Sequence, residues 1–509
     1  MNHSLARHSA LYIVARLCPG IFAVAATAAL TRLLQPQEYG IYALALVIMT
    51  LGSSACFDWL NLSLLRFYET RRGDPKLVST FVSIFAVITL LSALGFGGLW
   101  ITGAFAGRST GIAIIGLMLV WTSSWFEFVS RLAVAEFQPL NYLLMSFGRS
   151  VFTLLGACGG AWLTGSPAWA ALGTGLGSFA GTFFVRVPVP LPSIRRFDRD
   201  LGREILRFGA PMAVSMIVGT MISSGSRLLV EELDSASALG LFTAASILAQ
   251  NTLAVIGAGV ASAGYPLAVR AMERGDTETV RRQLSANGTL LLAILAPASL
   301  GLALTGNCLA TTLVGSKFTS GVATLVPWIA ANTFFVAIQS NYLDHAFQLG
   351  LRPHLQVVVL LCSAGIAISL CFYEIPREGP LGAAIALTVS AAVGCALSAI
   401  LGRRGYPLPL PIASGARIAA ASALMALVVI MLPDSGWAGL TLRVGIGAIV
   451  YVLAALALNV ANVRAHLIGH VQRANLRLNA ETDEEPDTPV AMSLPARPQE
   501  RQPQPPFAA

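Results

Sequence analysis

Charged residues are scarce in this chain of 509 residues. They make up 11% of it and hydrophobic residues make up 55%, with a mean hydropathy of +0.70. Soluble domains carry roughly 25% charged residues. A chain so poor in charge cannot hide its apolar surface in a water-soluble core. The composition therefore excludes an ordinary soluble protein and predicts a protein of the lipid bilayer.

Lysine is almost absent, which excludes one class of transport ATPase. The phosphate-binding Walker loop needs a Gly-Lys pair. The two lysines of this chain are Lys76, which follows Pro75, and Lys317, which follows Ser316. We therefore predict that the chain does not hydrolyse ATP itself.

Paired cysteines, metal-ligand clusters and long connecting loops are also lacking. The seven cysteines form no CxxC pair, and only Cys308 is expected on the oxidising side of the membrane, so no disulfide framework is predicted. His466 and His470 are four residues apart, but no third metal ligand accompanies them. The longest connection outside the predicted spans, "TGNCLATTLVGSKFTSG", has no room for a catalytic domain. We expect no metal, no cofactor and no enzymatic activity.

Long apolar segments dominate what is present. They recur with lengths of about 18–25 residues, which lets a helix cross a hydrocarbon core of about 30 Å. We predict an all-α polytopic membrane protein with about 14 transmembrane helices. The predicted spans are 9–33, 39–62, 79–101, 111–131, 142–164, 168–187, 209–230, 239–262, 284–305, 321–343, 355–375, 380–401, 416–433 and 440–461.

Basic residues alternate between the two sides of this arrangement. About 25 of them fall in turns on one side, near 66–76, 195–207, 270–282 and 403–404. The turns on the other side hold little more than Arg32, Arg108, Lys317 and Arg377. Because Lys and Arg accumulate on the cytoplasmic side, both termini are predicted to be cytoplasmic. The net charge of +8 then reflects topology, and no nucleic acid is expected as a partner.

A short phrase occurs twice, about 200 residues apart. "LTRLLQPQEYGIYAL" begins at Leu30, and "SRLLVEELDSASALGLF" begins at Ser226. In each, Arg-Leu-Leu ends a predicted span and a Gly-aliphatic-aromatic triplet, Gly40–Tyr42 or Gly240–Phe242, opens the next. Two hairpins of one orientation predict parallel repeats related by an axis along the membrane normal.

The repeat predicts two parallel six-helix lobes and a C-terminal helix pair. The tail is acidic and then rich in Pro and Gln, so we predict that it is disordered. The predicted parts are an N-lobe at 1–187, a basic cytoplasmic linker at 188–208, a C-lobe at 209–401, a helix pair at 402–461, and a cytoplasmic amphipathic helix with a disordered tail at 462–509.

The two hairpins also resemble a known family. "LTRLLQPQEYGIYALALVI" resembles the opening hairpin of the polysaccharide transporter branch of the multidrug/oligosaccharidyl-lipid/polysaccharide exporter superfamily. "LRFGAPMAVSMIVGTMISSGSRLLVEELDSASALGLFTAASIL" is similar to the seventh and eighth helices of that branch. The resemblance implies a flippase for lipid-linked sugars used in O-antigen or exopolysaccharide synthesis. Family members often carry Asp before the Arg of the seventh helix, where this chain has Ser226 before Arg227.

Isolated charges inside spans mark candidate site residues, because each costs about 2.5–3.5 kcal/mol on insertion scales. Arg16 and Asp58 lie about 20 and 21 residues either side of the first turn, so they share a depth. Glu127 and Arg149 lie about 11 residues either side of the turn near Gln138 and also share a depth. Each pair could simply neutralise itself, or could line a wet cavity where guanidinium binds diphosphate.

Two further arginines lie near the outer ends of their spans. Arg227 and Arg443 are within about two turns of those ends, from which their side chains could reach the membrane surface. The resemblance places the first and seventh helices along a central cavity, which makes Arg16 and Arg227 candidate substrate ligands. Pro19-Gly20 interrupts the first span, either as a hinge or as a static kink.

The predicted function is a flippase of the bacterial inner membrane. It would carry a polyprenyl-diphosphate-linked oligosaccharide across the bilayer by alternating access for cell-surface polysaccharide synthesis. Arg16, Asp58, Glu127, Arg149 and Arg227 are the predicted substrate-binding residues, with Asp58 or Glu127 as possible coupling residues. Predicted partners are this lipid-linked substrate, membrane lipids and polysaccharide polymerase or glycosyltransferase machinery. The alternatives are a cation-coupled drug antiporter of the same superfamily and a polysaccharide polymerase or ligase.

Overall fold

The computed structural model describes residues 2–72, 74–102, 110–184, 189–190, 197–409 and 411–460. By its internal contacts the chain divides into residues 1–461 and 462–509, and all described residues belong to the first unit. The predicted amphipathic helix and tail, with His466 and His470, lie outside the described residues.

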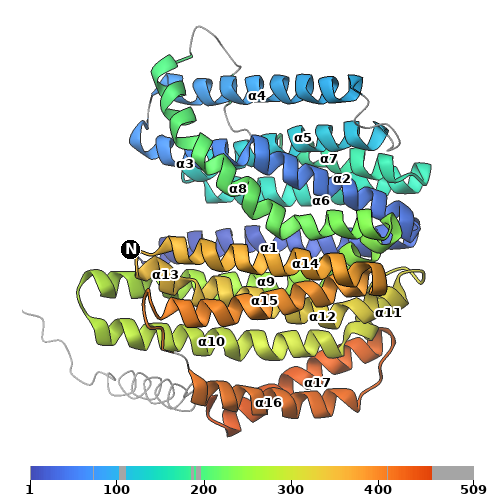
Figure 1. The fold of residues 1–509 in the computed structure, drawn as a ribbon, viewed down its shortest axis with the longest axis vertical. Coiled ribbons are helices and arrows are strands. Elements are labelled where there is room, and N and C mark those ends of the chain that lie inside the picture. Colours follow the sequence, from blue (N-terminus) through green and yellow to red (C-terminus); the bar gives the residue numbers. More distant parts are fainter. Residues whose placement is uncertain are drawn as a thin grey trace, which may run out of the picture. The chain divides into compact units, whose positions relative to one another are not determined.

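The described part of the chain is helical, with no strand among the described residues (Figure 1). The first helices are α1 (Asn2–Leu33), α2 (Pro36–Cys56), α3 (Asp58–Thr70), α4 (Pro75–Ile101), α5 (Thr110–Ala135), α6 (Pro139–Thr164) and α7 (Pro167–Gly181). Next come α8 (Arg199–Leu233), α9 (Ala236–Glu273), α10 (Thr277–Leu304), α11 (Gly306–Leu313) and α12 (Thr319–Ile338). The last are the π-helical turn η2 (Gln339–Leu343), α13 (His345–Leu349), α14 (Pro353–Glu378), α15 (Pro380–Gly402), α16 (Ile412–Ile430) and α17 (Gly436–Ala457).

Each of the 14 predicted spans falls on one of these helices or on a broken helix. Ten helices are long and apolar enough to cross a membrane, or up to eleven if the bent α8 counts as one span, among the described residues. The predicted span 168–187 corresponds to α7, which has only 15 residues. The chain is thus a multi-pass membrane protein, and the number 14 stays a prediction.

Local sequence signals begin many of these helices. Asp198, Ser235 and Asp276 accept hydrogen bonds from backbone N–H groups at the starts of α8, α9 and α10. Hydrogen bonds from backbone amides hold the pKa of the Asp198 carboxyl below its usual value, and the amide of Leu201 has the largest effect. Hydrogen bonds from Thr279 likewise lower the pKa of Asp276. Proline occupies the first turn of six helices, where its missing N–H costs nothing: Pro36, Pro75, Pro139, Pro167, Pro353 and Pro380.

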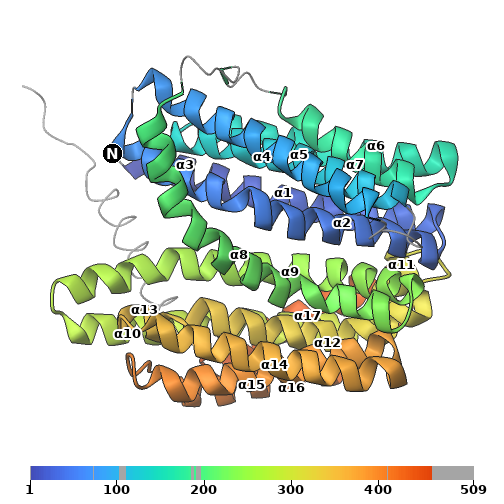
Figure 2. The ribbon, with the colours of Figure 1, turned by 45° about the horizontal axis from the view of Figure 1, so that its top comes forward.

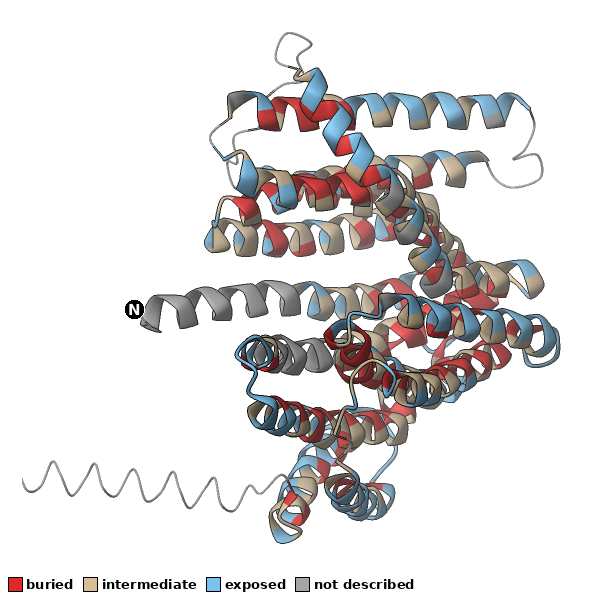
Figure 3. Ribbon diagram, turned by 60° about the vertical axis from the view of Figure 1, so that its left-hand side comes forward, coloured by how far each residue is buried: buried red, intermediate tan, exposed pale blue. Residues whose placement is uncertain are grey.

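The outward surface of the bundle is apolar, as a bilayer requires. Leu90, Leu91 and Leu94 on α4 have exposed fractions of 60–64%. In Figure 3 much of α4 is exposed, whereas buried residues concentrate where helices face one another. Such surfaces suit lipid chains rather than water.

Helix α8 connects two groups of helices, α1–α7 and α9–α17 (Figure 2). Its first half packs on α3, where the Phe67 and Phe208 ring centroids are 6.1 Å apart and Gly209 lies against Trp59. Its last turns pack on α9 and α14. The two halves, Arg199–Met221 and Ser224–Leu233, meet at an angle of 49°. A Gly/Ser-rich segment at the bend explains it, since such segments kink helices.

The repeated phrases meet each other in the fold. A Cβ atom on Gly40 would lie 1.6 Å from the Ala236 oxygen, and one on Gly240 would lie 2.2 Å from the Pro36 oxygen. Pro36 and Ala236 each begin a helix, and each glycine is the fifth residue of its helix. This reciprocal contact between α2 and α9 is what a two-fold relation produces. It supports the predicted parallel repeats.

The two lobes are joined by further contacts at the same end, which we call the Gln35 end after the residue between α1 and α2. Arg32 Nη2 donates to the Thr312 carbonyl at 2.7 Å, and the Gly315 amide donates to Thr31 Oγ1 at 3.1 Å. The Tyr39 and Phe318 ring centroids are 5.6 Å apart. We call this set of contacts the seam. The opposite end, with the α3–α4 turn at Arg71, is the Arg71 end.

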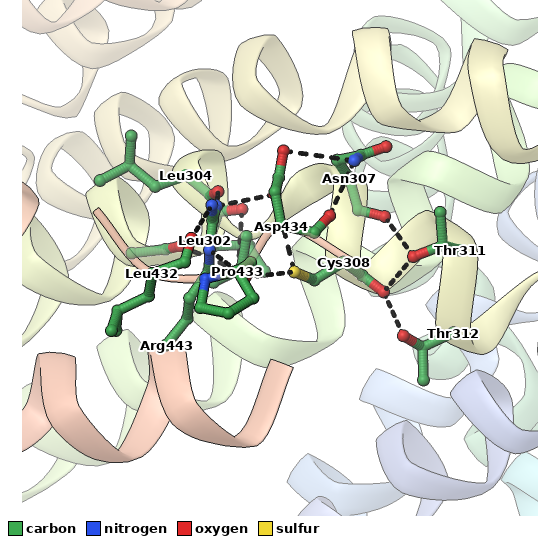
Figure 4. A network of polar contacts seen from close by, with 12 residues as sticks. Leu302, Leu304, Asn307, Cys308, Thr311, Thr312, Leu432, Pro433, Asp434 and Arg443 are labelled. Carbon is green, nitrogen blue, oxygen red and sulfur yellow. Dashed lines mark hydrogen bonds and ion pairs between the residues drawn. The ribbon is translucent and has the colours of Figure 1, made fainter. Parts of the chain in front are cut away.

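The C-terminal helix pair is anchored to the Gln35 end of the C-lobe by Arg443 (Figure 4). Its side chain is 7% exposed and pairs with Asp434 at 2.7 Å. It also donates to the carbonyls of Leu304, Leu432 and Pro433 at 2.7–2.9 Å, at the ends of α10 and α16. Arg443 therefore reaches toward the Gln35 end, as its place near the end of the predicted span allows, and there it caps the last carbonyls of two helices.

Candidate functional site

Two adjoining cavities lie among the helices of the N-lobe, and one of them also reaches α8. The α6 cavity has a volume of about 440 Å³ and is lined by α1, α2, α5, α6 and α7. The α3 cavity has a volume of about 460 Å³ and is lined by α2, α3, α5 and α6 with Met216 of α8. Both are lined by Met49, Ser123, Glu127 and Arg149. A charged pair thus stands where the two cavities meet.

Glu127 and Arg149 form the ion pair that their equal depth predicts. Arg149 Nη1 donates to Glu127 Oε1 at 2.9 Å. The two side chains keep exposed fractions of 26% for Arg149 and 38% for Glu127, so the pair neutralises itself while still facing the cavities. The pair is therefore an ion pair that also lines the cavities, and its role in binding a diphosphate stays a prediction.

The surrounding helices hold Arg149 in place. Its guanidinium carbon lies 4.5 Å from the centre of the Phe126 ring. A Cβ atom on Gly181 would lie 2.7 Å from Arg149 Cα, so α7 packs directly on the backbone of α6 at this point. The packing of α7 on the backbone at Arg149 and the Phe126 ring beside its guanidinium restrict the Arg149 side chain to few conformations.

The α3 cavity adds more polar groups. Asp58 lines it and begins α3, immediately after α2 ends. Arg131 also lines it, with its Nε 3.9 Å from Glu127 Oε2 one turn earlier on α5. Asn61 Oδ1 is buried in its lining and has no hydrogen-bond partner within the described part of the chain. A buried acceptor without a partner indicates a site where a hydrogen-bond donor can bind.

The structure brings together only part of the predicted set. Asp58, Glu127 and Arg149 line the α3 cavity. Arg16 lies on α1, but its side chain is outside the described residues, so its pairing with Asp58 stays a prediction. Arg227 on α8 donates to Gln250 on α9 at 3.5 Å and lines neither N-lobe cavity. Its role as a substrate ligand also stays a prediction.

Sequence reasoning missed several cavity residues. Arg131 follows Glu127 by four residues, a spacing that places both on one helix face and could have been noticed. Phe126, Tyr142 and Ser146 carry no such signal, because aromatic and small polar residues are common along membrane helices. Pro19 lines the α6 cavity, and α1 continues through it without interruption.

Chemically, the site suits an anion with many oxygen atoms. Two arginines, Arg131 and Arg149, share one carboxylate, and guanidinium binds phosphate oxygens in a bidentate manner. No group of three or more His, Cys, Asp or Glu side chains that could hold a metal ion occurs among residues 2–460 where they are described.

Comparison with known proteins places this fold in a family. The model of a family described as "Polysaccharide biosynthesis protein" matches residues 29–323, more than half of the chain. The chain belongs to this family. The matched region contains the seam glycines, the α3 cavity, the bend of α8 and the lining of the α6 cavity apart from its α1 residues. No curated protein sequence matches the chain.

Two solved structures show the fold of this family member. A structure of the lipid II flippase MurJ in an inward closed conformation has a TM-score of 0.68 and 15% identity. It covers 88% of this chain and 98% of that one. An inward-facing multidrug resistance MATE family transporter of the MOP superfamily has a TM-score of 0.53 and 15% identity, covering 80% and 95%. The polysaccharide biosynthesis family member therefore has the fold of these membrane transporters.

Proposed function

We propose that this protein is a flippase for a polyprenyl-diphosphate-linked oligosaccharide. The observation that carries the proposal is the charged pair Glu127–Arg149 at the junction of two cavities, with Arg131 beside it. A sugar diphosphate needs both guanidinium groups and room for several sugar units. The adjoining volumes of about 440 and 460 Å³ are of the size that small-molecule sites have.

Arg149 and Arg131 would bind the diphosphate, and Arg16 would join them from α1. Glu127 would hold Arg149 in position, and Asp58 would do the same for Arg16. The aromatic and hydroxyl side chains of the α6 cavity suit sugar rings, which have apolar faces and hydroxyl edges. The prenyl chain would remain in the bilayer while the head crosses.

The membrane orientation follows from the basic residues. We assign the Arg71 end to the cytoplasm of a bacterial inner membrane and the Gln35 end to the outside. The seam then closes the outer side, while the α3 cavity extends from Thr50 to Leu65, next to Arg66 at the cytoplasmic mouth. Substrate would enter from the cytoplasm, and the lobes would rock apart at the seam to release it.

Asp58 or Glu127 would couple transport to a proton or sodium gradient, because each is an acid placed in the cavity. Transport that continues unchanged after the gradients are collapsed, or in the double variant Asp58→Asn/Glu127→Gln, would remove this part of the proposal.

The proposal can be tested in cells that lack this gene. Their lipids would be extracted, and the leaflet of any polyprenyl-linked oligosaccharide assigned with an impermeant probe. Accumulation on the cytoplasmic leaflet, reversed by the wild-type gene but not by Arg149→Ala, is the expected result. Accumulation on the outer leaflet would instead indicate a polymerase or ligase.

A drug antiporter is the second candidate, favoured by the shared fold of the MATE transporter. Unchanged lipid-linked sugars together with increased drug sensitivity in the deletion strain would favour this alternative.

A further inference from the structure

A buried carboxylate lies in the C-lobe, far in sequence from the charged cavity. Asp344 is 7% exposed and sits between η2 and α13. Ser398 Oγ on α15 donates to its Oδ1 at 3.1 Å, and Gln356 Nε2 on α14 donates to its Oδ2 at 3.2 Å. One carboxyl group thus joins three helical elements through two neutral donors.

A second group of polar side chains lies next to Asp344 and its two donors. A Cβ atom on Gly394 of α15 would lie 2.4 Å from Ser363 Oγ and 2.9 Å from Gln339 Oε1, so both side chains point to the same spot. Ser363 Oγ is buried and has no hydrogen-bond partner within the described residues. Gln339 precedes Asp344 by five residues, which is the length of η2. The two groups together form a short polar layer between η2, α14 and α15.

Asp344 has no ion-pair partner among the described residues, unlike Glu127. The Cys395 thiol on α15 is in electrostatic contact with it. Helix α12, which precedes η2, contains no ionisable side chain. Helix α9 also packs on η2, and the side chain of its Tyr265 lies outside the described residues. The other ionisable groups on the adjoining elements, where they are described, are Tyr342 on η2, His345 on α13, Arg352 and His354 at the start of α14, Cys362, Cys371, Tyr373, Glu374, Arg377 and Glu378 further along α14, Arg403, Arg404 and Tyr406 after α15, and Arg270 and Glu273 on α9.

A small pocket lies on the side of Ser398. A pocket of about 10 Å³, enough for about one water molecule, is lined by Ser398 together with Arg403 and Tyr406. Arg403 and Tyr406 lie at the Arg71 end of the bundle. One water molecule in this pocket would lie between those residues and Ser398, whose hydroxyl donates to Asp344.

The backbone beside Asp344 is also unusual. The turn η2 is π-helical, and the Asp344 amide donates to the Gln339 carbonyl at 2.9 Å. Such turns occur in helices frequently at functional sites, and they can shift to regular helix by one residue. A change in the charge of Asp344 would act directly on this turn, because the carboxyl group follows it immediately.

We propose that Asp344 is a proton-binding site in the C-lobe, separate from the charged cavity. An unpaired carboxylate held by two neutral donors in a membrane interior is costly, and a proton removes its charge. On uptake an O–H bond forms on one carboxylate oxygen, while a hydronium ion at the Arg71 end gives up that proton and becomes water. The neutral acid keeps its contacts with Ser398 and Gln356, and a rearranged η2 releases the proton. A role for this cycle in transport rests on the proposed function, whereas proton binding does not.

Proton binding can be measured without transport. Infrared difference spectra of the purified full-length protein in lipid would be recorded as a function of pH, in the Asp58→Asn/Glu127→Gln background that removes the cavity acids. A protonated carboxyl band that titrates is expected, and Asp344→Asn should remove it. The control Glu278→Gln, at an exposed acid of α10, should keep it. A band that persists unchanged in Asp344→Asn would overturn the proposal.

A conservative variant covers the case in which Asp344→Asn does not fold. Ser398→Ala deletes one donor and leaves the carboxyl group in place, so it should shift both the frequency and the midpoint of the band. A band insensitive to this change would also overturn the assignment.

Transport assays separate the two proposals. In proteoliposomes containing lipid-linked oligosaccharide extracted from the deletion strain, the wild type should be stimulated by a pH gradient. Asp344→Asn should lose that stimulation completely. If the wild type moves no such lipid while the Asp344 band titrates, the proposed function fails and the proton site stands. If transport occurs and responds equally to the gradient in Asp344→Asn, the site has no coupling role.

Discussion

At the scale of single residues, Arg149 combines three restraints. Glu127 accepts its hydrogen bond at 2.9 Å, Phe126 lies beside its guanidinium, and Gly181 packs on its backbone. Because one carboxylate satisfies only part of the guanidinium, donors remain available for an anion from the cavity. The same arrangement that makes the charge tolerable in a membrane therefore leaves it able to bind substrate.

Replacing Arg149 tests this reasoning. A hydrogen bond to a charged group contributes about 1.5–3 kcal/mol, so Arg149→Ala should reduce transport about 10- to 150-fold. Arg149→Lys should restore the charge but only part of the activity, because Lys lacks the planar fork. Leaflet-resolved transport in proteoliposomes is the measurement, with protein yield and thermal unfolding as the check on folding. Full activity of Arg149→Ala would exclude it from substrate binding.

Exchanging Glu127 and Arg149 tests whether transport needs the guanidinium at its position on α6 or needs only a neutral ion pair. The double variant Glu127→Arg/Arg149→Glu keeps an ion pair across the same hairpin, so folding should recover relative to either single variant. Transport should not recover, because the guanidinium then extends from α5 instead of α6. A fully active double variant would show that the pair is only structural. The exchange Arg16→Asp/Asp58→Arg should behave in the same way if those residues also pair.

Counting residues from a turn predicted the Glu127–Arg149 pair, because two helices of a hairpin keep a common depth at 1.5 Å per residue. The same reasoning could not find Asp344, which lies just beyond the predicted span 321–343. Its burial depends on how α13, α14 and α15 pack, and no local pattern encodes that. The contacts of Arg443 with Leu304 and Pro433 could not be predicted either, because only the fold brings these segments together.

At the scale of helices, α6 and α7 show how small residues allow close packing. A Cβ atom on Gly156 would lie 2.3 Å from the Gly173 oxygen, and one on Gly173 would lie 2.0 Å from the Gly156 oxygen. Gly160 and Gly177, each four residues further on, make equally close approaches to Trp169 and Phe152. Glycines at such spacing are the usual means by which membrane helices reach backbone contact.

A single methyl group at this interface should be harmful. Gly173→Ala should destabilise the protein by about 1–3 kcal/mol, because the backbone of α6 must move away. Gly159→Ala is a matched control on α6, since nothing lies within 4 Å of its Cβ position. That control should be neutral or stabilising by up to about 1 kcal/mol, as Ala favours helix. Unfolding in mixed micelles measures both, and equal stability of the two variants would contradict the packing argument.

The seam glycine Gly40 should affect conformation rather than folding alone. Its Cβ would overlap the Ala236 oxygen, so Gly40→Ala should weaken the closed seam by about 1–3 kcal/mol and raise the open population about 5- to 150-fold. Reaction of a cysteine placed at Tyr39, which is buried in the seam, reports this opening. Gly95→Ala, with nothing within 4 Å of its Cβ, is the control. Unchanged reactivity at Tyr39 would show that the seam tolerates the methyl group.

Helix boundaries were predictable where turns carry Pro, Asp or Ser, and less so where a helix changes direction. The break between α2 and α3 at Phe57 and the bend of α8 near Met221 arise inside apolar runs that read as single spans. Helix α11 lies within a segment that reads as a loop, since its eight residues are too few for a periodic signal. Tertiary contacts decide the break at Phe57 and the position of α11, whereas the Gly/Ser-rich segment favours the bend of α8.

At the scale of the molecule, the two lobes meet closely at the Gln35 end. One hydrophobic core there includes Leu30, Tyr39 and Ala43 of the N-lobe with Leu239 and Phe318 of the C-lobe. The α6 cavity lies within the N-lobe, and the buried polar layer around Asp344 lies within the C-lobe. Rocking about the seam would carry each of these two sites as part of a rigid lobe, whereas the α3 cavity, which Met216 of α8 also lines, would change with the position of α8.

Rocking predicts opposite changes at the two ends of the bundle. Spin labels at Gln37 and Lys317 report the Gln35 end, and labels at Phe137 and Leu351 report the Arg71 end, since all four residues are exposed. Arg32→Ala removes the hydrogen bond to Thr312 and should lengthen the first distance while it shortens the second. The measurement is pulsed electron resonance in a background with the seven native cysteines replaced.

A label pair within one lobe, Phe137 and Leu163, is the control for that experiment and should keep its distance, because both residues belong to the N-lobe. Lengthening at Gln37–Lys317 with no change at Phe137–Leu351 would indicate local opening of the seam, not rocking. The charged cavity would then need its own gate at the Arg71 end. We would expect that gate among the basic residues near Arg66, whose guanidinium carbon lies 4.2 Å from the centre of the Phe208 ring.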